Sequence, residues 1–244
     1  MFHPGKSVGS YILSEYQDKR SPSQQIERRL ATPFVTVSRQ VGAYGHTFAE
    51  LLSAYLKKHE RRAKGPWSVC DRDLVQTVIE ENRYPKEIAP FLGEVPLAEV
   101  TDMIEEIFGV HPSQWTLVHR MSEAILRLAQ GGYVIIVGRG ANIITRKFPG
   151  GIHVRLIGSL EKRLAHFCEY YRLPAKKGRQ LLLKQQRERR GFIKKYFFTD
   201  IENPLLYHHV INTDEVRIED AAELIGGLVL RAGGPPAGHK EEEA

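Results

Sequence analysis

Two glycines and a threonine, set between an apolar segment and an amphipathic one, form the clearest candidate for chemistry in this sequence. Gly42 and Gly45 follow the apolar residues 34–38, and Thr47 stands where the amphipathic segment begins. If the first segment is a strand and the second a helix, the helix start offers backbone N–H groups and the positive end of the helix dipole. Both attract phosphate, so we predict that this loop binds a phosphate group.

The loop departs from the phosphate-binding pattern G-x-x-x-x-G-K-[ST] at two positions. Gly45 and Thr47 match the second glycine and the hydroxyl residue, but Gln40 replaces the first glycine and His46 replaces the lysine. A plain turn between a strand and a helix would carry the same residues. On the loop alone, both interpretations stay open.

Two further polar clusters follow apolar segments of the chain. Asp71 and Arg72 come after residues 67–70, and Arg139 stands between two glycines after residues 133–137. An arginine flanked by glycines allows close backbone approach and presents a planar fork that suits a phosphate. The alternatives are an Asp71 that caps the next helix and a turn in which Arg139 faces solvent.

The elements that must position these clusters alternate along the chain. We predict strands over 34–38, 67–70, 133–137, 152–157 and 208–212, and helices over 47–59, 72–82, 97–108, 113–130, 160–172, 175–197 and 219–230. This alternation predicts an α/β fold in which a mainly parallel sheet carries helices on both faces. In such sheets ligands bind at the carboxyl ends of the strands, where all three polar clusters would meet.

The composition is that of a globular protein. The 244 residues are 42% hydrophobic and 26% charged, and no apolar run approaches the roughly 20 residues of a membrane-spanning helix. The first residues lack the apolar core of a signal peptide, so we expect a cytoplasmic location and no membrane partner. Cys70 and Cys168 have no metal-ligand spacing, and we expect both to be reduced.

Positive charge is concentrated in one segment. The formal net charge is +6, and lysines and arginines cluster between residues 176 and 195, with a smaller group at 57–64. Aromatic residues are not interleaved at the spacing of a stacking platform for nucleic acid. We therefore expect a small polyanion as the ligand and do not favour nucleic acid as a partner.

Several segments in this order resemble the cytidylate kinase-like family of P-loop proteins. They are SRQVGAYG, CDRDL, VIIVGRGANII with FP shortly after, VRLIGSLEKRL, RERRGFIKKYF and HHVINTDEV. The resemblance spans about residues 33–230, and its most specific piece is Gly138-Arg139 with Phe148-Pro149. It implies a three-layer P-loop NTPase fold with a helical lid.

The resemblance also implies a division of the chain. A kinase-like domain would occupy 33–232, with a monophosphate-binding segment at 72–112 and an arginine-bearing lid at 175–200. An N-terminal extension would precede it at 1–32. The last residues, 233–244, have a composition that favours disorder.

The activity that the resemblance implies is phosphoryl transfer from ATP, with Mg²⁺, to a nucleoside monophosphate such as CMP or dCMP, or to a related small phosphate acceptor. The alternative is a catalytically weak nucleotide-binding protein that keeps the fold. Three departures favour that alternative. Gln40 and His46 depart from the phosphate-binding pattern, and Gly140 stands where bacterial cytidylate kinases carry an aspartate. The arginine-rich part of the lid, residues 184–195, has Glu188 as its one acidic residue and favours it too.

Site residues are carried over from the resemblance position by position. The donor ATP would be bound by Gly42, Ala43, Tyr44, Gly45, His46 and Thr47, with the Thr47 hydroxyl as the Mg²⁺ ligand. The acceptor would be bound by Asp71, Arg72, Arg139 and Arg155, and the catalytic arginines would be Arg39, Arg139, Arg187 and Arg190. Arg39 would compensate for the missing lysine. Arg189 lies alongside the lid pair, and Arg163 is expected to form pairs on a helix surface.

Overall fold

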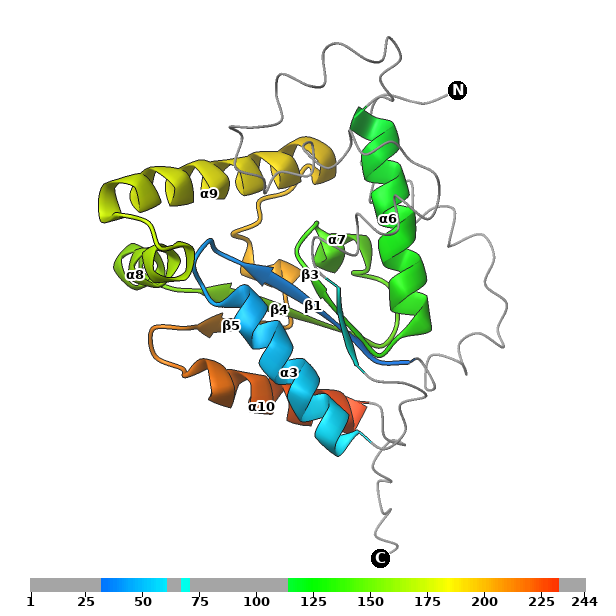
Figure 1. The fold of residues 1–244 in the computed structure, drawn as a ribbon. Helices are drawn as coiled ribbons and strands as arrows, with labels where there is room; N and C mark the ends of the chain where they lie inside the picture. Colours follow the sequence, from blue (N-terminus) through cyan, green and yellow to red (C-terminus); the bar gives the residue numbers. More distant parts are fainter. Residues whose placement is uncertain (1–31, 61–66, 71–113, 233–244) are drawn as a thin grey trace, which may run out of the picture.

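Five short strands pair into one parallel sheet in the computed structural model, which describes residues 32–60, 67–70 and 114–232 (Figure 1). The strands are β1 (Phe34–Arg39), β2 (Ser68–Cys70), β3 (Val134–Val137), β4 (Gly151–Ile157) and β5 (His209–Asn212). Their order in the sheet is β2-β3-β1-β4-β5, and every neighbouring pair is parallel. Because β1 lies at the centre, the loop that follows it opens at the middle of the sheet's carboxyl edge.

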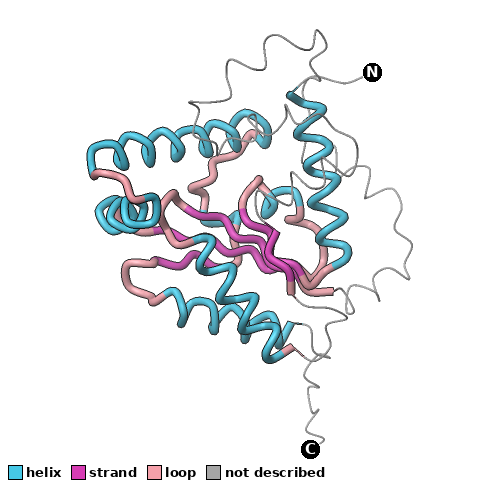
Figure 2. Tube along the Cα trace, viewed as in Figure 1, coloured by secondary structure: helices cyan, strands magenta, loops and turns pink. Residues whose placement is uncertain are grey.

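Helices cover both faces of this sheet (Figures 1 and 2). One face carries α3 (Gly45–His59) and α10 (Ile218–Ala232), which pack on each other. The other face carries α6 (Gln114–Gly131), α7 (Ala141–Ile144) and the C-terminal part of α9 (Ala175–Phe197). Helix α8 (Leu160–Tyr171) packs along α9, and the short 3₁₀ helix η3 (Pro204–Leu206) leads into β5.

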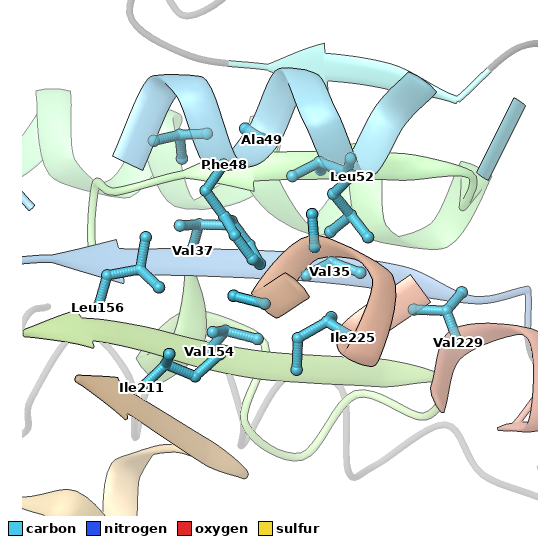
Figure 3. Packing of buried hydrophobic residues seen from close by; sticks show 14 of the residues in the cluster. Val35, Val37, Phe48, Ala49, Leu52, Val154, Leu156, Ile211, Ile225 and Val229 are labelled. Carbon is cyan, nitrogen blue, oxygen red and sulfur yellow. The ribbon is translucent and has the colours of Figure 1, made fainter. Parts of the chain in front are cut away.

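The alternation of side chains along the strands separates two apolar cores. Val35 and Val37 of β1 point toward α3 and α10, where they meet Phe48, Val154 and Ile225 (Figure 3). On the opposite face of the sheet, apolar residues of β3 pack with buried residues of α6, α7 and the end of α9. The predicted doubly covered sheet is thereby confirmed, including a β3 that is buried along its whole length.

A third, smaller apolar cluster holds the α8–α9 pair against the loop after β1. Val41 of that loop, Phe167 of α8 and Leu182 of α9 are its buried members. The cluster matters for function because it fixes α8 and the N-terminal half of α9 beside the predicted phosphate loop.

The predicted elements match the observed ones within two residues wherever the structure describes them. Helix α3 begins at Gly45 instead of Thr47, because Tyr44 takes a left-handed conformation and serves as the N-cap. Ser159 caps α8 as predicted, accepting a hydrogen bond from the Lys162 amide. The helices predicted over 72–82 and 97–108 lie outside the described residues. Within the described residues, no helix is long and apolar enough to cross a membrane.

Candidate functional site

The loop between β1 and α3 has the shape of an anion-binding turn. Gly42 has a φ of +83° and Tyr44 a φ of 55°, and the Ala43 amide donates to the Gln40 carbonyl at 3.2 Å. The first N–H groups of α3 have no acceptor within the helix itself. In the structure as described, the Tyr44 side chain makes no capping hydrogen bond to them. These amides therefore open toward the cavity at the edge of the sheet.

Helix α8 holds this loop from one side. Arg163 Nη1 donates to the Val41 carbonyl at 2.9 Å, and His166 Nδ1 lies 2.9 Å from the Gly42 carbonyl oxygen. The fit is tight, since a Cβ on Gly42 would collide with the Arg163 carbonyl oxygen. The prediction that Arg163 forms pairs on a helix surface is wrong. The residue is buried, and burial lowers the pKa of its guanidinium.

Two glutamines complete the support of the loop. Gln186 of α9 accepts a hydrogen bond from the Val41 amide at 2.9 Å, and Gln40 accepts one from the Gly158 amide at 3.0 Å. Gln40, which replaces the first glycine of the sequence pattern, thus ties the loop to the end of β4.

Arg39 lies between the predicted phosphate loop and the glycine-rich loop after β3. A Cβ on Gly45 would stand 2.7 Å from Arg39 Cγ, and a Cβ on Gly138 would collide with Arg39 Nη1. Both glycines therefore leave room for one arginine side chain. The structure brings Arg39 and the predicted donor loop together, and its guanidinium extends to the loop that carries Arg139.

His46 is an exposed residue of the first turn of α3. Its Nε2 lies 3.2 Å from Glu50 Oε1, one helical turn further along. The ring borders the cavity but is shorter than a lysine and pairs with a carboxylate on its own helix. This contact is typical of a helix surface pair, while Arg39 supplies the cation beside the loop.

Arg139 lies in an unusual backbone turn. Gly138, Arg139 and Gly140 all have positive φ angles, of 87°, 57° and 71°. A Cβ on Gly140 would lie 2.8 Å from Phe197 Cε2 and 3.3 Å from Ile193 Cδ1. The close approach of α9 therefore leaves little room for a side chain at position 140.

The arginines of α9 lie in different surroundings. Arg190 is turned to Asp200, with Nη2 2.7 Å from Oδ2, and Arg187 is exposed. Hydrogen bonds from the Glu202 amide and Arg190 lower the pKa of Asp200. Among the described residues, Arg189 is the arginine of α9 that lines the cavity. The sequence places Arg189 beside the predicted catalytic pair. Its spacing from the buried Leu182 and Ile193 shows that it lies on the inward face of α9.

Arg155 is enclosed beneath the sheet edge, with 2% of its surface exposed. Its Nη1 donates to Ser38 Oγ at 2.9 Å, and its guanidinium carbon lies 5.4 Å from the Tyr207 ring centre. Its Nη2 lies 2.8 Å from Glu202 Oε1, which is a contact between opposite charges. Within the described residues, this Nη2 atom has no partner with aligned hydrogen-bond geometry. These contacts favour a structural role. The other two predicted acceptor residues, Asp71 and Arg72, lie outside the described residues.

The cavity at this edge of the sheet has a volume of about 360 Å³. Its lining combines the phosphate loop with one face of α8 and of α9. The lining residues are Arg39, Gln40, Val41, Gly42, Tyr44, Gly45, His46, Thr47, Val137, His166, Phe167, Tyr170, Tyr171, Gln185 and Arg189.

The aromatic side of this cavity was not predicted. His166 and Tyr170 are one helical turn apart, and Phe167 and Tyr171 repeat that spacing. This pattern was visible in the sequence, but it is also that of an ordinary apolar helix face. The described part of the chain contains no group of three or more His, Cys, Asp or Glu side chains placed to hold a metal ion. Thr47, whose hydroxyl the sequence predicts as the Mg²⁺ ligand, borders the cavity.

Comparisons with known proteins agree with this architecture. Over 81% of the chain and 98% of the other protein, the structure resembles an uncharacterized protein from Eubacterium ventriosum ATCC 27560, with a TM-score of 0.60 and 15% identity. Weaker similarities are to shikimate kinase from Bacteroides thetaiotaomicron (TM-score 0.46, 12% identity, 81% and 98% covered) and from Acinetobacter baumannii in complex with shikimate (0.44, 21%, 86% and 97%). None of the curated proteins searched matches the sequence.

The sequence itself assigns the family. The model of the cytidylate kinase-like family matches residues 34–215, which run from the first residue of β1 to the turn after β5. The match includes every strand of the sheet and both loops that Arg39 connects. The chain belongs to the cytidylate kinase-like family.

Proposed function

We propose that this protein transfers the γ-phosphoryl group of ATP to a nucleoside monophosphate, such as CMP or dCMP, or to a related small phosphate ester. The observation that carries the proposal is the position of Arg39. Its side chain extends from the turn at the start of α3 to the backbone of Gly138, so one cation borders both the donor loop and the Arg139 loop. Transfer between two phosphates requires a charge at that junction.

The donor half of the reaction rests on the loop after β1. Phosphoryl transfer depends on positioned phosphates and neutralised charge more than on covalent chemistry by the protein. The amides of Gly42, Ala43, Tyr44, Gly45, His46 and Thr47 would surround the β-phosphate of ATP. Arg39 would supply the permanent positive charge that a lysine supplies in the usual pattern.

Magnesium fits the same place. A single protein hydroxyl beside bound phosphates is a suitable Mg²⁺ ligand, because this ion retains several waters and takes its remaining oxygens from the nucleotide. Thr47 at the cavity provides that hydroxyl. The ion, when bound with ATP, would neutralise charge on the phosphates.

The acceptor half rests on the loop after β3. Arg139 would bind the acceptor phosphate through its guanidinium, with glycines on both sides that allow close approach. Arg189 of α9 would stabilise charge on the transferring group, since it borders the cavity where Arg190 does not. Asp71 and Arg72 are proposed as further contacts to the acceptor.

A second candidate function is nucleotide binding without efficient transfer. The pairing of His46 with Glu50 favours it, because the residue at the lysine position is engaged on the helix surface. The two functions differ in whether ATP is turned over.

The test is formation of ADP from Mg-ATP in the presence of CMP, dCMP, UMP or AMP, each against a reaction without acceptor. The kinase proposal predicts ADP formation that depends on one of these acceptors. ATP binding without such turnover would support the second candidate instead.

A further inference from the structure

Aromatic side chains form a continuous row from the phosphate loop to the end of α8. The Tyr44 ring stacks on the His166 ring, with centres 3.7 Å apart and planes at 25°. His166 lies 6.1 Å from Tyr170, and Tyr170 lies 4.9 Å from Tyr171. The row begins at the N-cap of α3, where a phosphate would bind, and leads away from it along the cavity wall.

The far end of this row is open to solvent. Tyr170 is 58% exposed and Tyr171 is 53% exposed, and both border the cavity. Further along the same helix face toward its N-terminus, Phe167 is buried in the cluster with Val41 and Leu182. The apolar face of α8 therefore continues beyond the core that it serves, and its last turn presents two large aromatic rings to the cavity.

This arrangement matches the two ends of a nucleotide. Anionic phosphates suit the helix N-terminus, whereas a flat base suits exposed aromatic rings because stacking removes apolar surface from water. Gln185 borders the same cavity and offers an amide that both donates and accepts hydrogen bonds.

We propose that Tyr170 and Tyr171 form the base subsite of the donor nucleotide, and that they hold the base by stacking. The inference rests on the proposed function, since it assigns a nucleoside triphosphate to the cavity. Stacking is tolerant of base identity, because every base has a π face. The donor site therefore selects a nucleotide over inorganic polyphosphate, favours purines through their larger rings, and discriminates weakly between ATP and GTP.

Titrations with four Mg²⁺-bound ligands, ATP, GTP, CTP and inorganic tripolyphosphate, test the subsite. The wild-type protein is expected to bind ATP and GTP with affinities within about threefold of each other, and CTP and tripolyphosphate more weakly. Tyr170→Ala and Tyr171→Ala should each weaken ATP binding about tenfold and leave tripolyphosphate binding within twofold. Tyr170→Phe and Tyr171→Phe should retain ATP binding, because the ring is kept.

Phe198→Ala is the matched control, since Phe198 is 65% exposed and does not border the cavity. It should leave all four affinities unchanged. The subsite assignment is overturned if both alanine variants bind ATP like the wild type, or if they lose ATP and tripolyphosphate in equal measure. Wild-type protein that binds neither ATP nor tripolyphosphate would overturn the proposed function as well. ATP binding that depends on the tyrosines, without acceptor-dependent turnover, would support the subsite and contradict only the kinase activity.

Discussion

Arg39 places a cation beside a loop that lacks the lysine of the usual phosphate-binding pattern. The side chain starts from the end of β1, passes the first turn of α3 and ends against the backbone of Gly138. A lysine at position 46 would instead start from the helix surface, where His46 now pairs with Glu50. The charge therefore comes from the strand rather than from the helix.

His46→Lys tests this interpretation. The substitution adds a permanent cation at the start of α3, close to the proposed phosphates, and leaves Arg39 in place. We expect ATP affinity to rise or stay the same, as measured by calorimetric titration. A loss of tenfold or more would show that the imidazole itself contributes to the site.

Gly42→Ala should damage the loop. The backbone there has a φ of +83°, and a Cβ would collide with the Arg163 carbonyl oxygen. Left-handed strain alone costs on the order of 1–2 kcal/mol, and the clash adds to it. We expect the free energy of unfolding to fall by about 2 kcal/mol or more and ATP binding to weaken, measured by urea denaturation and by titration.

Gly191→Ala provides the control for that substitution. Gly191 lies within α9, is exposed, and a Cβ added there would meet no described atom within 4 Å. Alanine is the better helix former, so this variant should gain about 0.5–1 kcal/mol in stability without loss of ATP binding. Equal damage from both glycine substitutions would contradict the packing of α8 against the loop.

At the scale of elements, the α8–α9 pair determines which arginines reach the cavity. Leu182 and Ile193 are the buried anchors of α9, and Arg189 lies on their side of the helix. Arg189→Ala should therefore reduce the rate of ADP formation at least tenfold, since it would remove the positive charge that we propose stabilises the transferring group. Arg190→Ala should reduce it less than threefold, because Arg190 is engaged with Asp200. Steady-state kinetics on the two variants would decide, and a larger loss for Arg190→Ala would reverse the assignment.

A polar layer between β1 and β4 should make the fold sensitive to acid. His153 is buried, shares a hydrogen bond of 2.8 Å with Thr36 and stacks on His208. Burial, followed by repulsion from His208 and Arg146, lowers the pKa of His153 to about 3. Below about pH 6.5 the His153 side chain is protonated in the unfolded chain but stays neutral in the folded chain. The free energy of unfolding therefore falls as the pH falls from about 6.5 toward 3.

The measurement is urea denaturation at pH 7.5 and pH 5.5. Because the unfolded chain binds a proton at His153, the free energy of unfolding should be about 1.4 kcal/mol lower at pH 5.5 than at pH 7.5. His153→Gln should be less stable than the wild type at pH 7.5. Its free energy of unfolding should also fall less than that of the wild type between the two pH values, by about 1.4 kcal/mol. His59→Gln, on the exposed end of α3, is the control for replacing a histidine by glutamine. A wild-type slope in His153→Gln would show that other groups cause the acid sensitivity.

The elements and the glycine-containing turn after β1 could be predicted because their signals are local. Strand alternation, the glycines of the loop and the Ser159 cap are each visible within a few residues of sequence. The burial of Arg163 could not be predicted, since its partners are backbone carbonyls such as that of Val41, 122 residues away. Backbone acceptors have no sequence signature. The contacts of Arg155 were not apparent for a different reason: its side-chain partner Ser38 is brought opposite it only by the register of β1 and β4.

At the scale of the whole molecule, the strand order places the two described polar loops side by side. β1 pairs with β3 on one side and with β4 on the other, so the loops after β1 and β3 emerge next to each other at the same edge. Residues 42–47 and 138–140 are almost 100 positions apart in sequence, yet the Arg39 side chain borders both. Phosphoryl transfer between two bound phosphates needs this adjacency.

The most direct test of the account measures transfer of label from [γ-³²P]ATP to the best acceptor, in the wild type and in Arg139→Ala, with ATP affinity measured on both. Arg139 is proposed to serve the acceptor and not the donor. We therefore predict that Arg139→Ala loses at least a hundredfold in transfer rate, while its ATP affinity stays within about twofold of the wild-type value. Transfer that survives the substitution, or ATP binding that collapses with it, would contradict the placement of donor and acceptor at this edge of the sheet.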